Sequence, residues 1–513
     1  DSDDKLWTLI WWPDNARTAA SGPVFQSWAI DTVGGALVDE EKQWRLFQAW
    51  DKCAPSVYCG RCQVNPNMLA LELWGAPLFT DGSPDHDVCT LFDYPIDRFR
   101  DVLRPGELDA IVSYFQTFDP RFKVERWVKG FSYGLIGASN SIVINDEGHY
   151  SPPEPREGSL RQFGSLPNLQ LVSAEVAGFY QPRYPVETMV RSSLLIRDDY
   201  FLVTDTIRTS GAPLHFDWQV FTRGQVKVTP ENTVNIVTPE QVELDILPLN
   251  PAATVSLTDV PGFPRDLEGR STRIRYGLEG KDVSLPFLMV PHRRVTAVAD
   301  LSRGWCAVSQ SEADGLKAGL ERGVSRPEKV PAFEAGVAAA RDGDDGWIWA
   351  GRSFKVPARL AGKRLFLSFA SPVHGLRVWV NGRQIPVPGP TVKMEYPGFW
   401  YLPAVVEVTG AVKAGENSAV IAGQTHQGKL VNGALELMAE SPKPVLPSVT
   451  TLGADHYVVQ GAFGRDELLL NPSGQDFAAG TASGRASAVL LSEDGSFAAL
   501  QATPYLSPEF NRL

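Results

Sequence analysis

Apolar residues recur in short runs along most of the chain, and polar turn residues separate the runs. Leu69 to Trp74 alternates between apolar and other side chains with the two-residue period of a β-strand. Further strand-like runs follow at hairpin spacing, at 169–179, 190–196, 200–207, 215–221, 233–237 and 241–247. Regular spacing of this kind predicts a large antiparallel β-sandwich.

Helical patterns are confined to a few segments. Leu6 to Trp12 is apolar enough for a buried helix end, and Pro13 closes it. A strand pair is expected over 26–37, with Gly34-Gly35 as its turn, and a short helix over 107–118. Residues 312–341 are rich in Ala, Glu and Lys, which predicts a linker or surface helix at a domain boundary.

A second β-rich block begins at Trp347 and ends near Met438. Its order of elements, with Val380-Asn381-Gly382 followed by Gly415-Glu416-Asn417, resembles the galactose-binding-type jelly roll found beside many glycosidases. Asn-Gly tolerates the positive φ of a tight hairpin turn, so a hairpin is expected there. Short strands resume over 462–506, so the jelly roll is expected either as an insertion in the larger sandwich or as a domain that precedes a small third domain.

Composition narrows the choice of partners. The 513 residues are 43% apolar and 21% charged, and the chain is long enough for two or three domains. A net charge of −12 argues against a nucleic-acid backbone as the main partner. No apolar run reaches the length of a membrane span, and no secretory signal is visible. The opening Asp-Ser-Asp-Asp lacks a methionine, so we expect a processed or excised start.

Four of the five cysteines lie in one short region, as Cys53, Cys59, Cys62 and Cys89. Their spacing suits two disulfides that brace a loop, free structural thiols, or a structural zinc site. We favour disulfides for a protein expected to act outside the cytoplasm.

Three segments occur in an order that points to one family. They are 138–148, 191–205 and the His215-Phe216-Asp217-Trp218 strand. This order resembles the β-sandwich half of the heparinase II/III-like polysaccharide lyases. The resemblance implies a mainly β fold: a large antiparallel β-sandwich of the lyase super-sandwich type, a short N-terminal helical remnant of an α/α toroid, and an inserted jelly-roll β-sandwich. The expected divisions are 1–50, 51–311, 312–345, 346–441 and 442–513, for the helical lead-in, sandwich, linker, jelly roll and terminal strands that complete the sandwich.

The resemblance also implies a reaction, the β-elimination of a uronate-containing polysaccharide. Such a lyase neutralises the sugar carboxylate, removes the adjacent proton and protonates the leaving oxygen. Ser139-Asn140 stands where the family has His-Asn, so Asn140 is expected near the carboxylate. His149 and Tyr150 supply a titratable pair just beyond, and with Asn140 they form the expected catalytic set.

The expected substrate-binding residues are Arg61, Asn65, Asn67, Tyr180, Arg183 and Tyr184. Asn65 stands at the family's histidine, and an amide cannot shuttle a proton at neutral pH. Asp81 occupies the place of a family metal ligand, which makes it a weak candidate for binding a metal. The resemblance assigns His215 to the scaffold, and a buried Arg191 is expected to pair with a carboxylate.

Three functions stay open at this point. The first is a lyase, or the β-rich chain of one, with an acidic polysaccharide or oligosaccharide as substrate and a second chain carrying the α/α toroid. The second is a non-catalytic carbohydrate-binding protein, and the third a glycoside hydrolase. No cofactor is expected, with a structural metal left open as the less favoured alternative. The expected location is secreted or periplasmic, with no nucleic acid and no membrane span involved.

Overall fold

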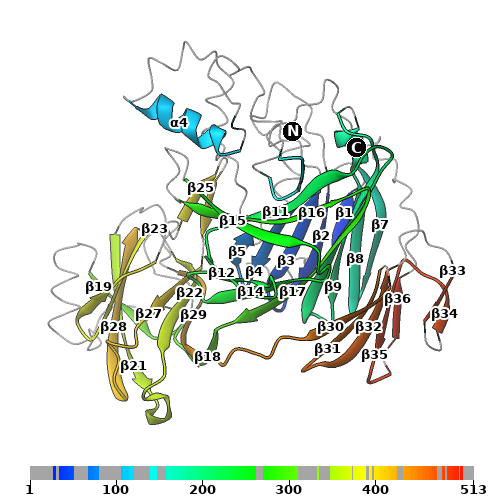
Figure 1. The fold of residues 1–513 in the computed structure, drawn as a ribbon. Coiled ribbons are helices and arrows are strands. Elements are labelled where there is room, and N and C mark those ends of the chain that lie inside the picture. The colour runs from blue at the N-terminus through cyan, green and yellow to red at the C-terminus, as the bar shows by residue number, and fades with distance from the viewer. Residues whose placement is uncertain are drawn as a thin grey trace, which may run out of the picture.

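A computed structural model describes twenty stretches of the chain. They are residues 27–30, 34–50, 67–79, 106–118, 120, 139–146, 158–181, 183–261, 270–309, 332–333, 347–372, 374–388, 392–395, 398–401, 403–424, 431–453, 455–470, 476–479, 482–495 and 497–500. These residues form several antiparallel sheets and very few helices (Figure 1). The mainly β fold expected from the sequence is confirmed.

The largest layer is an eight-stranded sheet in the order β12-β13-β14-β17-β10-β9-β8-β7. Its strands are β7 (Ser159–Leu166), β8 (Leu169–Glu175), β9 (Val186–Ile196), β10 (Tyr200–Thr209), β12 (Gln225–Val228), β13 (Val234–Val237), β14 (Val242–Pro248) and β17 (Asp282–Arg293). Consecutive hairpins build it, as the turn spacing predicted.

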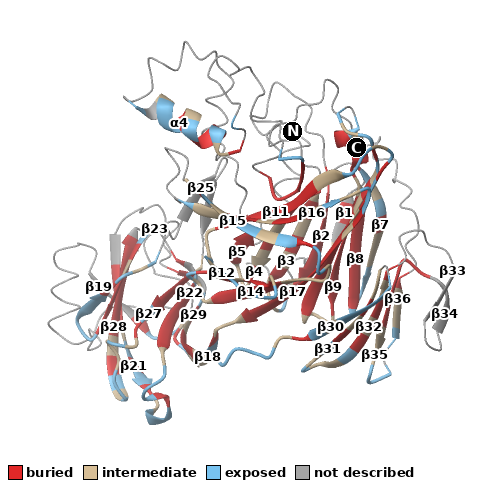
Figure 2. Cartoon of the chain, in the orientation of Figure 1, coloured by how far each residue is buried: buried red, intermediate tan, exposed pale blue. Residues whose placement is uncertain are grey.

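Two smaller sheets face the eight-stranded sheet. The first contains β1 (Trp28–Ile30), β2 (Gly34–Asp39), β3 (Trp44–Ala49), β4 (Met68–Leu73) and β5 (Ala76–Phe79). The second has the order β15-β16-β11-β6, from β6 (Ile142–Ile144), β11 (Leu214–Thr222), β15 (Thr254–Val260) and β16 (Ser271–Gly280). A single apolar core, with Trp218, Phe201 and Leu46 among its fully buried side chains, fills the space between the three sheets (Figure 2).

The predicted Gly34-Gly35 turn is wrong, although the strand pair around it is confirmed. Both glycines lie inside β2, where Gly34 pairs with Ile30 on one side and with Ala49 on the other. A Cβ on Gly34 would lie 2.9 Å from the carbonyl oxygen of Gln48, so the absence of a side chain serves close strand approach.

The terminal strands form a third layer. They are β30 (Ser448–Gly453), β31 (His456–Gly461), β32 (Gly464–Leu470), β35 (Ala488–Ser492) and β36 (Phe497–Leu500), with a separate pair of β33 (Asp476–Ala479) and β34 (Ala482–Arg485). Tyr457 and Leu490 of this sheet share a core with Leu194 and Leu202 on the eight-stranded sheet. The sheet therefore covers the face opposite the main core.

The jelly-roll block is a sandwich of two sheets around its own core. One sheet contains β18 (Val295–Asp300), β22 (Leu365–Pro372), β27 (Ala404–Glu407) and β29 (Val431–Glu440). The other contains β19 (Trp305–Ser309), β20 (Ala332–Phe333), β21 (Trp347–Val356), β23 (His374–Val380), β24 (Arg383–Ile385) and β28 (Gly415–Gln424). A pair, β25 (Val392–Glu395) and β26 (Gly398–Tyr401), and a 3-10 turn over Ala358–Leu360 complete it. The predicted hairpin at Asn381-Gly382 is confirmed, with both residues at positive φ.

Two α-helices are described, α4 (Glu107–Gln116), where a helix was expected, and α5 (Ala177–Tyr180). Within the described part of the chain, no helix has the length and apolar character needed to cross a membrane. The expected N-terminal helix at 6–12 and the clustered cysteines lie outside the described residues, as does most of the linker at 312–345.

Candidate active site

Behind the expected site lies a fully buried ion pair between two strands. Arg191 on β9 donates from Nε to Asp205 Oδ1 at 2.9 Å and from Nη2 to Asp205 Oδ2 at 2.8 Å. Neither side chain has any exposed surface. The remaining nitrogen, Nη1, donates to the backbone oxygens of Asn67 and Asn140. Arg191 thus ties the eight-stranded sheet to the segments that carry two of the expected site residues, and the expected pairing with a carboxylate is confirmed.

Asn140 and Asn67 both use their side chains to brace backbone. Asn140 donates from Nδ2 to the oxygen of Leu69 at 2.8 Å and accepts from the backbone nitrogen of Phe221 at 2.7 Å. Asn67, at a φ of 56°, accepts from Gln48 Nε2 at 2.9 Å and donates to the oxygen of Ala174 at 3.3 Å. Each residue is 1% exposed. These bonds give both side chains a bracing role in the scaffold, and the expected roles in catalysis and substrate binding stay predictions.

The tyrosines expected to bind substrate lie against the end of β6. Tyr180, 2% exposed, donates to the oxygen of Ile142 at 2.8 Å, and burial raises the pKa of its phenol well above the usual value. Half-buried Tyr184 donates to the oxygen of Ile144 at 3.4 Å, with the guanidinium of exposed Arg183 5.8 Å from its ring centre. Of the three, only Arg183 is exposed.

Five of the expected site residues lie outside the described residues, namely Arg61, Asn65, Asp81, His149 and Tyr150. Their roles stay predictions. Of these, His149 and Tyr150 follow Asp146 by three and four residues in the sequence, and Asp146 is described.

Polar side chains gather on the outward face of the β15-β16-β11-β6 sheet. The sequence patterns did not predict a functional site on this face. Phe216, Trp218 and Val220 of β11 point into the main core. The alternate positions of a strand lie on the opposite face, so His215, Asp217 and Gln219 point outward, next to every second residue of β16. The cross-strand pairs are His215 with Glu279, Asp217 with Gly277, and Gln219 with Arg275.

His215 is held over a glycine by a buried carboxylate. Its Nε2 lies 3.2 Å from Asp217 Oδ1, and its backbone nitrogen donates to Asn145 Oδ1 at 3.0 Å. A Cβ on Gly277 would lie 2.9 Å from the imidazole Cε1, so only glycine leaves room for the ring. The His215 side chain is 42% exposed and that of Asp217 only 7%. An accessible imidazole oriented by a fixed carboxylate is a common arrangement for proton transfer.

Arg275 fixes Asp217 in turn. Its Nη1 lies 3.5 Å from Asp217 Oδ2 and also contacts the carboxylate of exposed Asp146. Its Nε donates to Gln219 Oε1 at 3.1 Å, and Gln219 Nε2 donates to the backbone oxygen of Ser139 at 2.7 Å. One line of polar contacts therefore runs from His215 to the Ser139-Asn140 segment that the sequence placed at the site.

Arg273 lies farther along the same face, beside helix α4. Its side chain donates to the oxygen of Thr117 at 3.4 Å, and Phe118 packs against Phe221 on the neighbouring strand. Burial, with Arg275 nearby, lowers the pKa of Arg273 to about 10. We name the surface formed by His215, Asp217, Arg275 and Asp146 the β11–β16 polar face.

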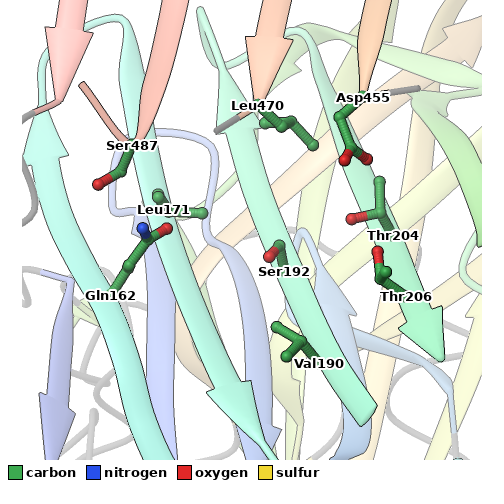
Figure 3. Close-up of a pocket in the computed structure, with 9 residues that line it drawn as sticks. All are labelled: Gln162, Leu171, Val190, Ser192, Thr204, Thr206, Asp455, Leu470 and Ser487. Carbon is green, nitrogen blue, oxygen red and sulfur yellow. The ribbon is translucent and has the colours of Figure 1, made fainter. Parts of the chain in front are cut away.

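A polar crevice between the eight-stranded sheet and the terminal sheet is too narrow for a sugar. Its volume is about 10 Å³, which suits about one water molecule. Figure 3 shows the carboxylate of Asp455 beside Thr204 and Thr206 there, with Ser192 and Ser487 farther along. We therefore place the candidate active site on the β11–β16 polar face.

Comparison with known proteins finds similarity only among solved structures. No family model and no curated protein matches the sequence. Heparan sulfate lyase HepC from Pedobacter heparinus is 14% identical, at a TM-score of 0.37 over 62% of this chain and 44% of that one. The heparinase III BT4657 gene product is 9% identical, at 0.38 over 60% and 43%. A β-glucuronidase from an uncultured Clostridium species is 15% identical, at 0.23 over 41% and 39%. The chain spans less than half the length of each of these structures.

Proposed function

We propose that this chain acts on a uronate-containing polysaccharide by β-elimination, as the β-rich part of a polysaccharide lyase. The observation that carries the proposal is the His215–Asp217 pair on the β11–β16 polar face. Nε2 and Oδ1 are 3.2 Å apart, and the imidazole is accessible while the carboxylate is fixed. The order of segments that resembles the heparinase II/III-like lyases supplies the reaction class.

In the proposed step, His215 takes the proton from the sugar carbon beside the carboxylate. The electrons of that C–H bond form a carbon–carbon double bond, and the bond to the glycosidic oxygen breaks. Tyr150, expected from the sequence, returns a proton to the leaving oxygen. Asp217 stabilises the imidazolium that forms, because a carboxylate at hydrogen-bond distance favours the protonated ring.

The family histidine is replaced by Asn65 in this chain, so His215 takes over its proton-transfer role in this proposal. Arg275 places a positive charge 3.5 Å from Asp217 Oδ2 and helps to hold the carboxylate in position. A second, toroid-bearing chain and a secreted or periplasmic location belong to the same proposal.

A non-catalytic carbohydrate-binding protein is the second candidate. Two observations favour it: the chain has Asn65 at the family's histidine, and the side-chain amides of Asn67 and Asn140 are committed to the scaffold. A binder needs no proton-transfer group, so it would tolerate any change at His215 that preserves folding.

The test is the ultraviolet absorbance of the unsaturated uronate that elimination produces, measured over a panel of uronate polysaccharides. His215→Gln is expected to abolish product formation and Asp217→Asn to lower it by roughly 10²-fold or more. His456→Gln is the matched control, because His456 Nε2 lies 2.9 Å from Glu467 Oε1 on the terminal sheet. Polysaccharide binding without product in the wild-type chain would favour the second candidate instead.

A further inference from the structure

A second cluster of ligand-type side chains lies on the eight-stranded sheet, which is a different sheet from the one that carries the β11–β16 polar face. Glu243 and Asp245 occupy alternate positions of β14, so they share one face of the strand. His292 on β17 is the cross-strand partner of Glu243, and Asn235 on β13 is the partner of Asp245. Register alone therefore brings two carboxylates, an imidazole and an amide together.

The cluster is buried on the side of the eight-stranded sheet that the terminal sheet covers. Glu243 is 4% exposed, Asp245 2% and His292 8%. Leu446, which follows β29 along the chain, packs against the core beneath the terminal sheet. The segment 441–447 thus crosses this part of the sheet, and it carries Lys443.

The two carboxylates and the imidazole of this cluster have the spacing of metal ligands. One ligand atom from each of Glu243, Asp245 and His292 lies within 4.8 Å of the others. Two carboxylate oxygens and one imidazole nitrogen suit a divalent transition metal such as Zn²⁺ better than Ca²⁺ or Mg²⁺, which prefer oxygen ligands alone.

His292 supplies an independent observation. Its side chain is 9% exposed, and neither ring nitrogen is aligned for a hydrogen bond. Its Nε2 nevertheless lies 3.0 Å from Glu243 Oε2. A buried polar group without a hydrogen bond destabilises the fold. A metal ion bound between these side chains gives the imidazole nitrogen a partner in the buried site.

Lys443 provides a cation in the structure described. Its Nζ lies 2.6 Å from Glu243 Oε1 and 3.0 Å from Asp245 Oδ1, while Asn235 Nδ2 donates to the same two carboxylates. The Lys443 side chain is 44% exposed, so it can leave the cluster for solvent without crossing the core. An ammonium on a flexible stem is a replaceable occupant.

We propose that Glu243, Asp245 and His292 form a binding site for a divalent transition-metal ion, and that the ammonium of Lys443 competes with the metal for this site. Metal binding transfers both carboxylates from Lys443 to the ion. Arg294, with Nε 3.4 Å from Glu243 Oε2, remains beside the cluster as a neighbouring cation. The site is independent of the proposed function, because none of its residues lies on the β11–β16 polar face.

The experiment measures metal binding to the full chain after chelator treatment, with Zn²⁺ by calorimetry and Co²⁺ by absorption. The wild-type chain is expected to bind one ion at this site. His292→Ala is expected to lower the affinity for that ion by roughly tenfold or more. Lys443→Met is expected to tighten binding by roughly tenfold or more, because the competing charge is gone. His456→Ala and Lys42→Met are matched controls that keep wild-type affinity.

The Co²⁺ spectrum separates this site from the clustered cysteines. Thiolate ligands give intense charge-transfer bands, whereas oxygen and nitrogen ligands give only weak visible bands. Co²⁺ bound at the proposed site is expected to give a spectrum without thiolate bands. Two results would overturn the proposal. One is that the wild-type chain and His292→Ala bind the ion held by oxygen and nitrogen ligands with equal affinity. The other is that Lys443→Met binds it no more tightly than the wild-type chain. Circular dichroism of each variant shows that it is folded.

Discussion

The guanidinium of Arg191 holds the carboxylate of Asp205 at 2.8–3.0 Å, and both side chains are completely buried. Through its third nitrogen, Arg191 also binds the backbone beside β4 and β6. The pair therefore joins two layers of the sandwich at one point. It holds the backbone of Asn67 and Asn140 in position.

Asp205→Asn is expected to lower the free energy of unfolding by about 3–5 kcal/mol, because it leaves a buried guanidinium without its counter-charge. Urea denaturation followed by circular dichroism measures the loss. Arg208→Ala breaks the Arg208–Asp282 pair, whose side chains are 65% and 77% exposed, and should cost less than about 1 kcal/mol. Equal losses in the two variants would show that the buried pair is not a hub of the fold.

Asn140→Ala is expected to lower the free energy of unfolding by about 2–4 kcal/mol. The change leaves the oxygen of Leu69 and the nitrogen of Phe221 without the amide that now binds them. Asn250→Ala removes a similar pair of bonds at a solvent-accessible edge, to Ser284 and Ala252, and should cost less than about 1 kcal/mol. If Asn140→Ala kept full stability and lost only product formation, Asn140 would be a substrate residue and not a brace.

Alkaline pH is expected to unfold the protein through four buried phenols, those of Tyr180, Tyr200, Tyr276 and Tyr457. Burial is the main reason that each phenol's pKa in the fold is above its ordinary value of 10.0. Their contribution to stability is therefore complete below about pH 10 and is lost as the pH rises further. Phenolate absorbance and circular dichroism should change together, and ionisation of these tyrosines in the folded protein would contradict the expectation.

Asn417 is expected to be the main support of the jelly-roll loop that begins β28. It is 4% exposed, accepts from Asn381 Nδ2 at 2.8 Å and from the nitrogen of Lys413 at 2.9 Å, and donates to two further backbone oxygens. Asn417→Ala should lower the free energy of unfolding of the jelly roll by about 2–4 kcal/mol. Exposed Glu416→Ala is the control, and an equal shift of the thermal midpoint in both variants would contradict the assignment.

Local patterns in the sequence were enough to predict most of the sheets. The runs at 200–207 and 215–221 became β10 and β11, whose residues are nearly all buried, because a short apolar run between turn residues is typical of a buried strand. The hairpin at Asn381-Gly382 also has a local reason, since both residues adopt the positive φ that a tight turn requires. The layer formed by the terminal strands is less local, because its core joins residues such as Leu202 and Leu490, which are far apart in the sequence.

The candidate site was only partly predictable from the sequence. Arg191 was expected to find a carboxylate, and it does. His215 was assigned to the scaffold, yet its ring is accessible, because the strand partner opposite Asp217 is Gly277 and a glycine leaves the space open. The one signal available was the His-x-Asp spacing, which places both side chains on the same face of a strand.

The most direct test of the proposed function compares the wild-type chain with His215→Gln for formation of unsaturated uronate, under conditions where both bind the polysaccharide. We predict product from the wild-type chain, supplied with its toroid-bearing partner chain where the chain alone is inactive. We predict none from His215→Gln at unchanged affinity, and wild-type product from His456→Gln. Equal product from the wild-type chain and His215→Gln would contradict the central role of the His215–Asp217 pair, and binding without product in every variant would leave a carbohydrate-binding protein.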